Sequence, residues 1–97
     1  MIQAINDSET KYKLKLFIAG NEPNSVQAVK NVKSILDNRI KDKYSLKVID
    51  ILNDFQSAID NGVLVTPMLI ITQPQPETTI VGTMSDIEKL KAALRIK

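Results

Sequence analysis

Residues 13–19 read KLKLFIA, residues 24–41 read NSVQAVKNVKSILDNRIK, and residues 46–51 read LKVIDI. The first segment alternates apolar and lysine side chains, and the third is rich in β-branched residues, so both are expected to be strands. Strand, long helix, strand predicts a βαβ unit with parallel strands and a right-handed crossover. The apolar residues of the middle segment recur at helical spacing, at Val26, Val29, Val32, Leu36 and Ile40.

The residues before this helix predict where it starts. Gly20 and Pro23 break the first strand, and Asn24 is a good N-cap. Gln27 follows three residues later, as in a capping box. The helix is expected to fade over residues 41–43.

A short second helix is expected next, capped by Asn53 or Asp54 and stopped by Asn61-Gly62. Residues 63–71 then form an extended segment that Thr66-Pro67 interrupts. Residues 73–77 contain two prolines and predict a turn.

A strand over residues 78–81 ends at Gly82 and pairs with the preceding segment as a hairpin. The last helix opens with Ser85-Asp86-Ile87-Glu88, in which Ser85 and Glu88 match a capping box. Ile87, Leu90 and Leu94 give this helix its buried stripe.

The complete order, β-α-β-α-β-β-α, matches the thioredoxin-like fold, an α/β fold with a mixed four-stranded sheet. In that fold the X-Pro bond at the start of the third strand is typically cis, so Pro67 is expected to be a structural cis-proline. A chain of 97 residues is sufficient for one domain. We expect a flexible N-terminal arm over residues 1–11 and a single domain over residues 12–97.

Composition excludes several kinds of chemistry. The chain has no cysteine and no histidine, so it has no thiolate, no disulfide and no imidazole for general-base catalysis or metal binding. We therefore expect no enzymatic activity, no cofactor and no metal. Asp50, Asp54 and Asp60 could cluster, but helix caps and solvated surface are their simpler roles.

The charge pattern argues against nucleic acid and membrane partners. Thirteen basic and eleven acidic residues give a formal net charge of +2, without the excess of a nucleic-acid binder. Lys11, Lys13 and Lys15 alternate along the first strand, which we interpret as a solvated strand face. No apolar run approaches the roughly 20 residues that cross a bilayer, and the N-terminus lacks the apolar stretch of a secretory signal. A cytoplasmic protein of bacterial type is expected.

Several blocks resemble the KaiB family of circadian clock proteins. LKLFIAGN (residues 14–21) with PNSV (residues 23–26) resembles the opening of KaiB, and YSLKVIDI (residues 44–51) resembles its second strand. TPML (residues 66–69) and IVGTMSD (residues 80–86) match two further blocks. The resemblance extends from about Tyr12 to Leu94.

This resemblance implies a non-enzymatic regulatory protein. KaiB binds the ring-shaped ATPase KaiC and helps to sequester KaiA, so the implied partners are a KaiC-type ATPase and a KaiA-like protein. KaiB is also metamorphic, with a tetramer whose C-terminal half is rearranged and a thioredoxin-like state that engages KaiC. The resemblance thus leaves open a dimeric or tetrameric homo-oligomer and the rearranged tetramer-type fold as an alternative.

Departures from the family pattern select the candidate residues. Ala93 and Arg95 replace a common glycine and acid, and each change favours a C-terminal helix, by about 1 and about 0.3–1 kcal/mol. We therefore predict a thioredoxin-like resting state, with Ala93 and Arg95 in the fold-switch region. The family's usual basic residues are replaced by Gln27 and Gly62 and, before Ile80, by Thr78 and Thr79. With Ser45 and the retained Lys47, the candidate partner-binding residues are Gln27, Ser45, Lys47 and Gly62.

Two other functions remain open. A KaiB homologue that binds a different partner, such as a stress-related adaptor, would explain the lost basic residues. A glutathione-binding thioredoxin-like protein would use Ser25 as the hydroxyl near a bound thiolate. For Ser25, the role of helix cap with Asn24 is simpler.

Overall fold

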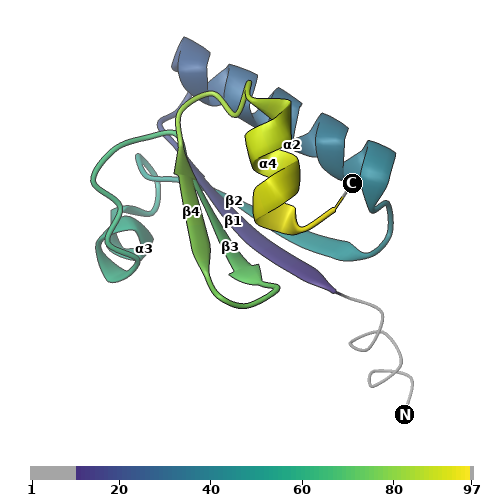
Figure 1. The fold of residues 1–97 in the computed structure, drawn as a ribbon. Coiled ribbons are helices and arrows are strands. Elements are labelled where there is room, and N and C mark those ends of the chain that lie inside the picture. Colours follow the sequence, from purple (N-terminus) through teal and green to yellow (C-terminus); the bar gives the residue numbers. More distant parts are fainter. Residues whose placement is uncertain (1–10, 97) are drawn as a thin grey trace.

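The computed structural model describes residues 11–96, which form a four-stranded sheet with helices on both of its faces (Figure 1). The expected N-terminal arm lies, except for Lys11, outside the described residues. The elements in chain order are β1 (Tyr12–Ile18), α2 (Pro23–Arg39), β2 (Tyr44–Asp50), α3 (Phe55–Asp60), β3 (Met68–Gln73), β4 (Thr78–Val81) and α4 (Ile87–Leu94).

The sheet is mixed, with the strand order β2-β1-β3-β4. Strands β1 and β2 are parallel, from the pair Tyr12 and Tyr44 to the pair Ile18 and Asp50. Strand β3 is antiparallel to β1 and forms a hairpin with β4. The predicted element order and the mixed four-stranded sheet are confirmed.

Helices α2 and α4 cover one face of the sheet, while α3 lies apart from them, toward the other face and near the end of the strands (Figure 1). Alternation along β1 assigns Leu14 and Leu16 to the first face and Phe17 to the second. The core of the second face is small, with Phe17, Ile49, Met68 and Ile70. The core of the first face is larger, and its fully buried side chains include Leu16, Ala28, Val32, Leu36, Leu69, Ile71 and Leu94.

The expected start of α2 was wrong by two residues. Glu22, rather than Asn24, is the N-cap, and its carboxylate accepts a hydrogen bond from the Ser25 amide. Pro23 is the first helical residue, a position where its missing N–H costs nothing. The helix also ends earlier than expected, at Arg39.

The expected apolar stripe of α2 was only partly right. Val26 is 52% exposed, whereas Ala28 and Ile35 are buried beside Val32 and Leu36. The first turn of the helix contributes Ser25 rather than Val26 to the interior. The stripe thus follows the packing of α2 on the sheet and not the valine pattern alone.

Helix α4 starts with Asp86, not Ser85, as its N-cap. The Asp86 carboxylate accepts a hydrogen bond from the Lys89 amide, and Ser85 instead pairs with the Thr83 hydroxyl. Leu90 and Leu94 are buried as expected, but Ile87 is 40% exposed.

Residues 63–65 are not part of a strand, because β3 begins only at Met68. The Thr66–Pro67 peptide bond is cis and Pro67 is buried. Leu64 and Val65 precede this bond and are exposed, so the extended segment expected over residues 63–71 divides into an exposed loop and a buried strand.

Candidate functional site

Helix α3 begins at a cap that the sequence predicts. The Asp54 carboxylate accepts hydrogen bonds from the Ser57 amide at 3.0 Å and from the Ser57 hydroxyl at 2.7 Å. These two bonds lower the pKa of Asp54. The helix has only six residues, and Ala58 is its one buried side chain. A helix anchored by an alanine leaves its larger apolar side chains in solvent.

Large apolar side chains of α3 and of the segments just before and after it are exposed, and we call this group the α3 patch. Leu64 is 91% exposed, and the other members are between half and three-quarters exposed. Phe55, Leu64 and Val65 line one shallow cavity of about 190 Å³. Exposed apolar groups of this kind mark interaction surfaces. The members of the α3 patch are Leu52, Phe55, Ile59, Leu64 and Val65.

Asp50, at the end of β2, connects the loop before α2 to the turn that leads into α3. Its Oδ1 accepts hydrogen bonds from the Gly20 amide and from the Leu52 amide, both at 3.0 Å. Gly20 has a φ of 53°, and a Cβ there would lie 2.9 Å from the Leu52 side chain. The glycine therefore lets Leu52 pack against the loop before α2.

Ser45 and Lys47 lie on one face of β2, and both are exposed. They pair in register with Lys13 and Lys15 of β1, so this part of the sheet presents three lysines. Lys15 reaches α3, where its Nζ donates a hydrogen bond to the Asn61 side chain at 3.3 Å. The structure thus brings Ser45 and Lys47 to the same face of the sheet as α3.

Gly62 follows the end of α3 and lies beside Asn61. It is exposed and has a φ of 68°, a conformation that glycine adopts without strain. A basic side chain at this position would therefore strain the backbone. Gly62 joins Ser45 and Lys47 on the face of the sheet that carries α3.

Gln27 does not lie on the sheet face that carries Ser45, Lys47 and Gly62. Its side chain donates a hydrogen bond to Asn31, and Asn31 donates to the Thr83 carbonyl in the loop before α4. This chain of bonds directs Gln27 toward the β4–α4 side of α2 and away from β2. Of the four candidate partner-binding residues, the structure brings three to one face and separates Gln27.

No residue of the α3 patch was named as a candidate in the sequence analysis. The sequence did contain a signal for these residues. Leu64 and Val65 are apolar, and the alternation typical of a strand does not extend beyond three residues in their segment. Phe55 and Ile59 are spaced four residues apart, as on one helix face. Leu64 and Val65 were expected within the extended segment over residues 63–71, and no role was assigned to Phe55 or Ile59.

The hydroxyl of Ser25 is not available to a ligand. Ser25 is fully buried, and its Oγ accepts a hydrogen bond from the Ala19 amide at 3.0 Å. It ties the end of β1 to the start of α2, where thioredoxin-like proteins carry their reactive thiol. No residue between Gly20 and Ser25 is a cysteine.

The acidic residues act locally. Asp50 and Asp54 cap backbone amides, and Asp60 accepts a hydrogen bond from Gln56 at 2.8 Å. Within residues 11–96 no three His, Cys, Asp or Glu side chains group closely enough to hold a metal ion. Over the same residues, no helix is long and apolar enough to span a bilayer.

Asp37 changes the titration of a tyrosine at the start of β2. The Tyr44 hydroxyl donates a 2.6 Å hydrogen bond to the Asp37 carboxylate. This bond, with smaller effects from burial and from the charges of Asp37 and Asp42, raises the pKa of Tyr44. The bond links the end of α2 to β2 and favours the protonated phenol.

The fold and this site define a thioredoxin-fold protein that has no thiol at the usual reactive position and exposes an apolar patch beside a basic sheet face. The profile described as KaiB domain matches residues 15–96, and the chain belongs to the KaiB family. It is 47% identical over 83 residues to the circadian clock oscillator protein KaiB of Rippkaea orientalis, which covers 86% of this chain and 80% of that protein. The KaiB of Nostoc sp. is 42% identical over 90 residues, 93% of this chain and 83% of that protein.

Solved structures agree with this fold. The N-terminal domain of Synechococcus elongatus SasA has a TM-score of 0.71 and 26% identity, over 89% of this chain and 85% of that domain. A thioredoxin from Fasciola hepatica has a TM-score of 0.72 over 99% of this chain and 90% of that protein. Its identity is 14%, so it bears on the fold alone. The predicted thioredoxin-like fold and the KaiB resemblance are both confirmed.

Proposed function

We propose that this chain is a non-enzymatic KaiB-type regulatory protein that acts in the cytoplasm by binding a KaiC-type ATPase ring. The α3 patch is the observation that carries the proposal. Five large apolar side chains are exposed on a 97-residue domain, within two short stretches of sequence, residues 52–59 and 64–65. A protein partner would remove them from water, which favours association by roughly 25 cal/mol per Å².

The polar surroundings of the α3 patch fit a specific interface. Lys47 and Lys15 lie on the adjoining sheet face, while Asp54 and Asp60 mark the two ends of α3. An apolar centre with charged residues around it is the usual anatomy of a protein interface. The charges would steer the encounter, and the apolar centre would supply most of the affinity.

The direct test is binding to the purified KaiC-type ATPase from the same genome, in the presence of ATP, by biolayer interferometry. Leu64→Asp places a charge at the centre of the α3 patch, on a side chain that is 91% exposed. We expect it to weaken binding at least about tenfold, because the carboxylate must be desolvated in the complex.

Ile87→Asp is the matched control. It adds the same charge at another exposed apolar residue, at the start of α4, where an acid is tolerated. It should bind like the unsubstituted protein. Equal binding by Leu64→Asp and the unsubstituted protein would remove the α3 patch from the interface.

A second candidate function is binding of a protein other than KaiC through the same surface. It is favoured by the absence of a basic side chain at Gln27 and Gly62, and at Thr78 and Thr79, where KaiB relatives commonly carry one. No binding of KaiC, together with capture of another protein by the unsubstituted chain but not by Leu64→Asp, would support this candidate.

Glutathione binding is disfavoured by the geometry of Ser25. Its hydroxyl is buried and already accepts the Ala19 amide. Glutathione-dependent turnover by the purified protein, lost on Ser25→Ala, would contradict the non-enzymatic proposal.

A further inference from the structure

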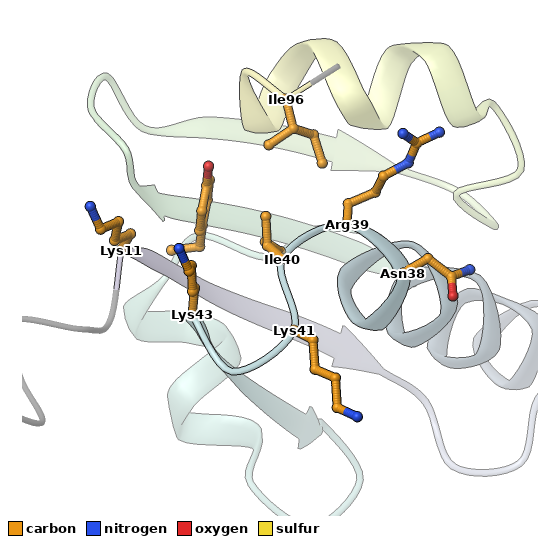
Figure 2. Close-up of a pocket in the computed structure, with 8 residues that line it drawn as sticks. Lys11, Asn38, Arg39, Ile40, Lys41, Lys43 and Ile96 are labelled. Atoms are coloured by element: carbon orange, nitrogen blue, oxygen red, sulfur yellow. The ribbon is translucent and has the colours of Figure 1, made fainter.

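A cavity of about 620 Å³ lies where the chain enters the sheet, between the first residues of β1 and β2 and the residues that follow α2 and α4 (Figure 2). Its volume is in the range of small-molecule sites, about 300–1,000 Å³. Four of its eight lining residues are basic, and none is acidic. The residues that matter for the argument are Lys11, Tyr12, Arg39, Ile40, Lys43 and Ile96.

Backbone hydrogen bonds place two of these lysines, Lys11 and Lys43, side by side. The amides of Lys11 and Tyr12 both donate to the Lys43 carbonyl, at 2.8 and 3.1 Å. Lys11 and Lys43 immediately precede the paired residues Tyr12 and Tyr44 of the parallel strands. Figure 2 shows their side chains next to each other on one side of the cavity. Neighbouring like charges on paired strands are destabilising unless an opposite charge joins them.

No protein group offsets these charges within the described part of the chain. Over residues 11–96, neither Lys11 nor Lys43 forms an ion pair or a side-chain hydrogen bond. Arg39 also lines the cavity, across from the two lysines (Figure 2). Lys41 also lines the cavity, but its side chain points away from the others in the same view.

The floor of the cavity is apolar. Ile40 is 6% exposed and belongs to the larger core, and Ile96 packs against that core. Figure 2 shows Ile40 and Ile96 facing each other between the lysine side and Arg39. An apolar floor between cationic walls suits a molecule with an uncharged body and a strongly anionic group.

We infer that this cavity is a binding site for a small organic phosphate, with Lys11 and Lys43 as the principal phosphate ligands. A phosphate carries about −1.5 to −2 charges near pH 7 and three acceptor oxygens, so it can satisfy two ammonium groups at once. A single carboxylate carries one charge and would leave one lysine uncompensated. Lysine and arginine are both established phosphate ligands.

The site is separate from the α3 patch. The cavity lies at the first residues of β1 and β2, whereas Asp50 is the last residue of β2 and Leu52 lies two residues beyond it. Six residue steps along a strand correspond to about 20 Å. The inference therefore goes beyond the proposed partner binding and does not depend on it.

The test uses the purified protein and follows amide chemical shifts by NMR during titration with ATP, tripolyphosphate and adenosine. ATP and tripolyphosphate should shift amides of residues 11–12, 39–43 and 96, and adenosine alone should not. If ATP binds more tightly than tripolyphosphate, the apolar floor contributes, as expected for an organic phosphate. If both bind equally, the site is one for inorganic polyphosphate, and the organic part of the inference is wrong.

The double variant Lys11→Gln/Lys43→Gln should weaken ATP binding at least about tenfold, because two charge-assisted contacts are lost. Lys30→Gln/Lys33→Gln removes the same charge from exposed positions of α2 outside the cavity. This variant should change the affinity for ATP by less than about twofold. Equal weakening by the two variants would mean a non-specific charge effect, and shifts centred elsewhere, or none, would overturn the inference.

Discussion

At the residue scale, single polar groups position the surface that we assign to binding. Asp50 joins the loop before α2 to the turn before α3 by accepting two amides with one oxygen. Ser25 joins β1 to α2, and Asp54 starts α3. Each of these groups accepts hydrogen bonds from backbone amides in the structure. The residues that thioredoxin-like enzymes use for chemistry are replaced here by residues that hold the backbone.

Asp54 provides a pH-dependent test of this role. Its pKa is lowered in the folded protein, chiefly by the hydrogen bonds from Ser57, from an ordinary value of 3.8. A lowered folded-state pKa gives stability that is present above the unfolded pKa and is lost as pH falls through the folded pKa. Between pH 5 and pH 3 the thermal midpoint should therefore fall more for the unsubstituted protein than for Asp54→Asn, which caps without titrating.

Asp60→Asn, at the other end of α3, is the control and should retain the acid dependence of the unsubstituted protein. Circular dichroism melts at half-unit pH steps make the comparison. An unchanged pH profile in Asp54→Asn would show that the cap bonds do not persist in solution.

At the element scale, α4 is the segment that bears on the rearranged fold that the sequence resemblance left open. It is a helix over Ile87–Leu94, anchored by Leu90 and Leu94. Ala93 lies within it, where alanine is favoured over glycine. Arg95 follows it with a φ of 62°, a left-handed conformation that costs a non-glycine residue about 1–2 kcal/mol. This strain offsets the benefit expected from a positive charge at the end of the helix.

Two glycine substitutions should therefore have opposite effects on α4. Ala93→Gly should lower the free energy of unfolding by about 1 kcal/mol, since glycine is a poor helix residue. Arg95→Gly should raise it by about 0.5–1 kcal/mol, since glycine relieves the left-handed strain. Urea denaturation measures both, and a loss of stability in Arg95→Gly would contradict the assigned backbone conformation.

The resting state can be tested on the same helix. We predict that the thioredoxin-like state predominates in solution, with helical Cα chemical shifts over residues 87–94 and slow amide exchange at Leu90 and Leu94. Strand-type shifts over residues 85–95 would instead indicate the rearranged fold.

At the scale of the whole molecule, the sheet carries two distinct surfaces at its two ends. The α3 patch lies beyond the last residues of β1 and β2, and the basic cavity lies at their first residues. Substitutions about 20 Å apart with no shared contacts act independently in most proteins. The two surfaces can therefore be altered one at a time.

The last prediction follows from the independence of the α3 patch and the basic cavity. Leu64→Asp should bind ATP with unchanged affinity in the NMR titration, and Lys11→Gln/Lys43→Gln should bind the KaiC-type ATPase within about twofold of the unsubstituted protein. The combined triple variant should show both defects, weaker binding of ATP and weaker binding of the KaiC-type ATPase. If the lysine variant loses ATPase binding, the cavity belongs to the protein interface, and the two surfaces are not separate.

The sequence by itself determined the order of elements, the parallel pairing of the first two strands and the absence of a thiol site, because these follow from local periodicity and from which residue types are present. It also predicted a helix cap at Asn53 or Asp54 and a helix stop at Asn61-Gly62. The exposure of Leu64, the separation of Gln27 from Lys47 and the pairing of Lys11 with Lys43 were decided only by the tertiary structure. Each depends on which segments pack together, and packing partners distant in the chain leave no periodic signal in the residues that they bury or expose.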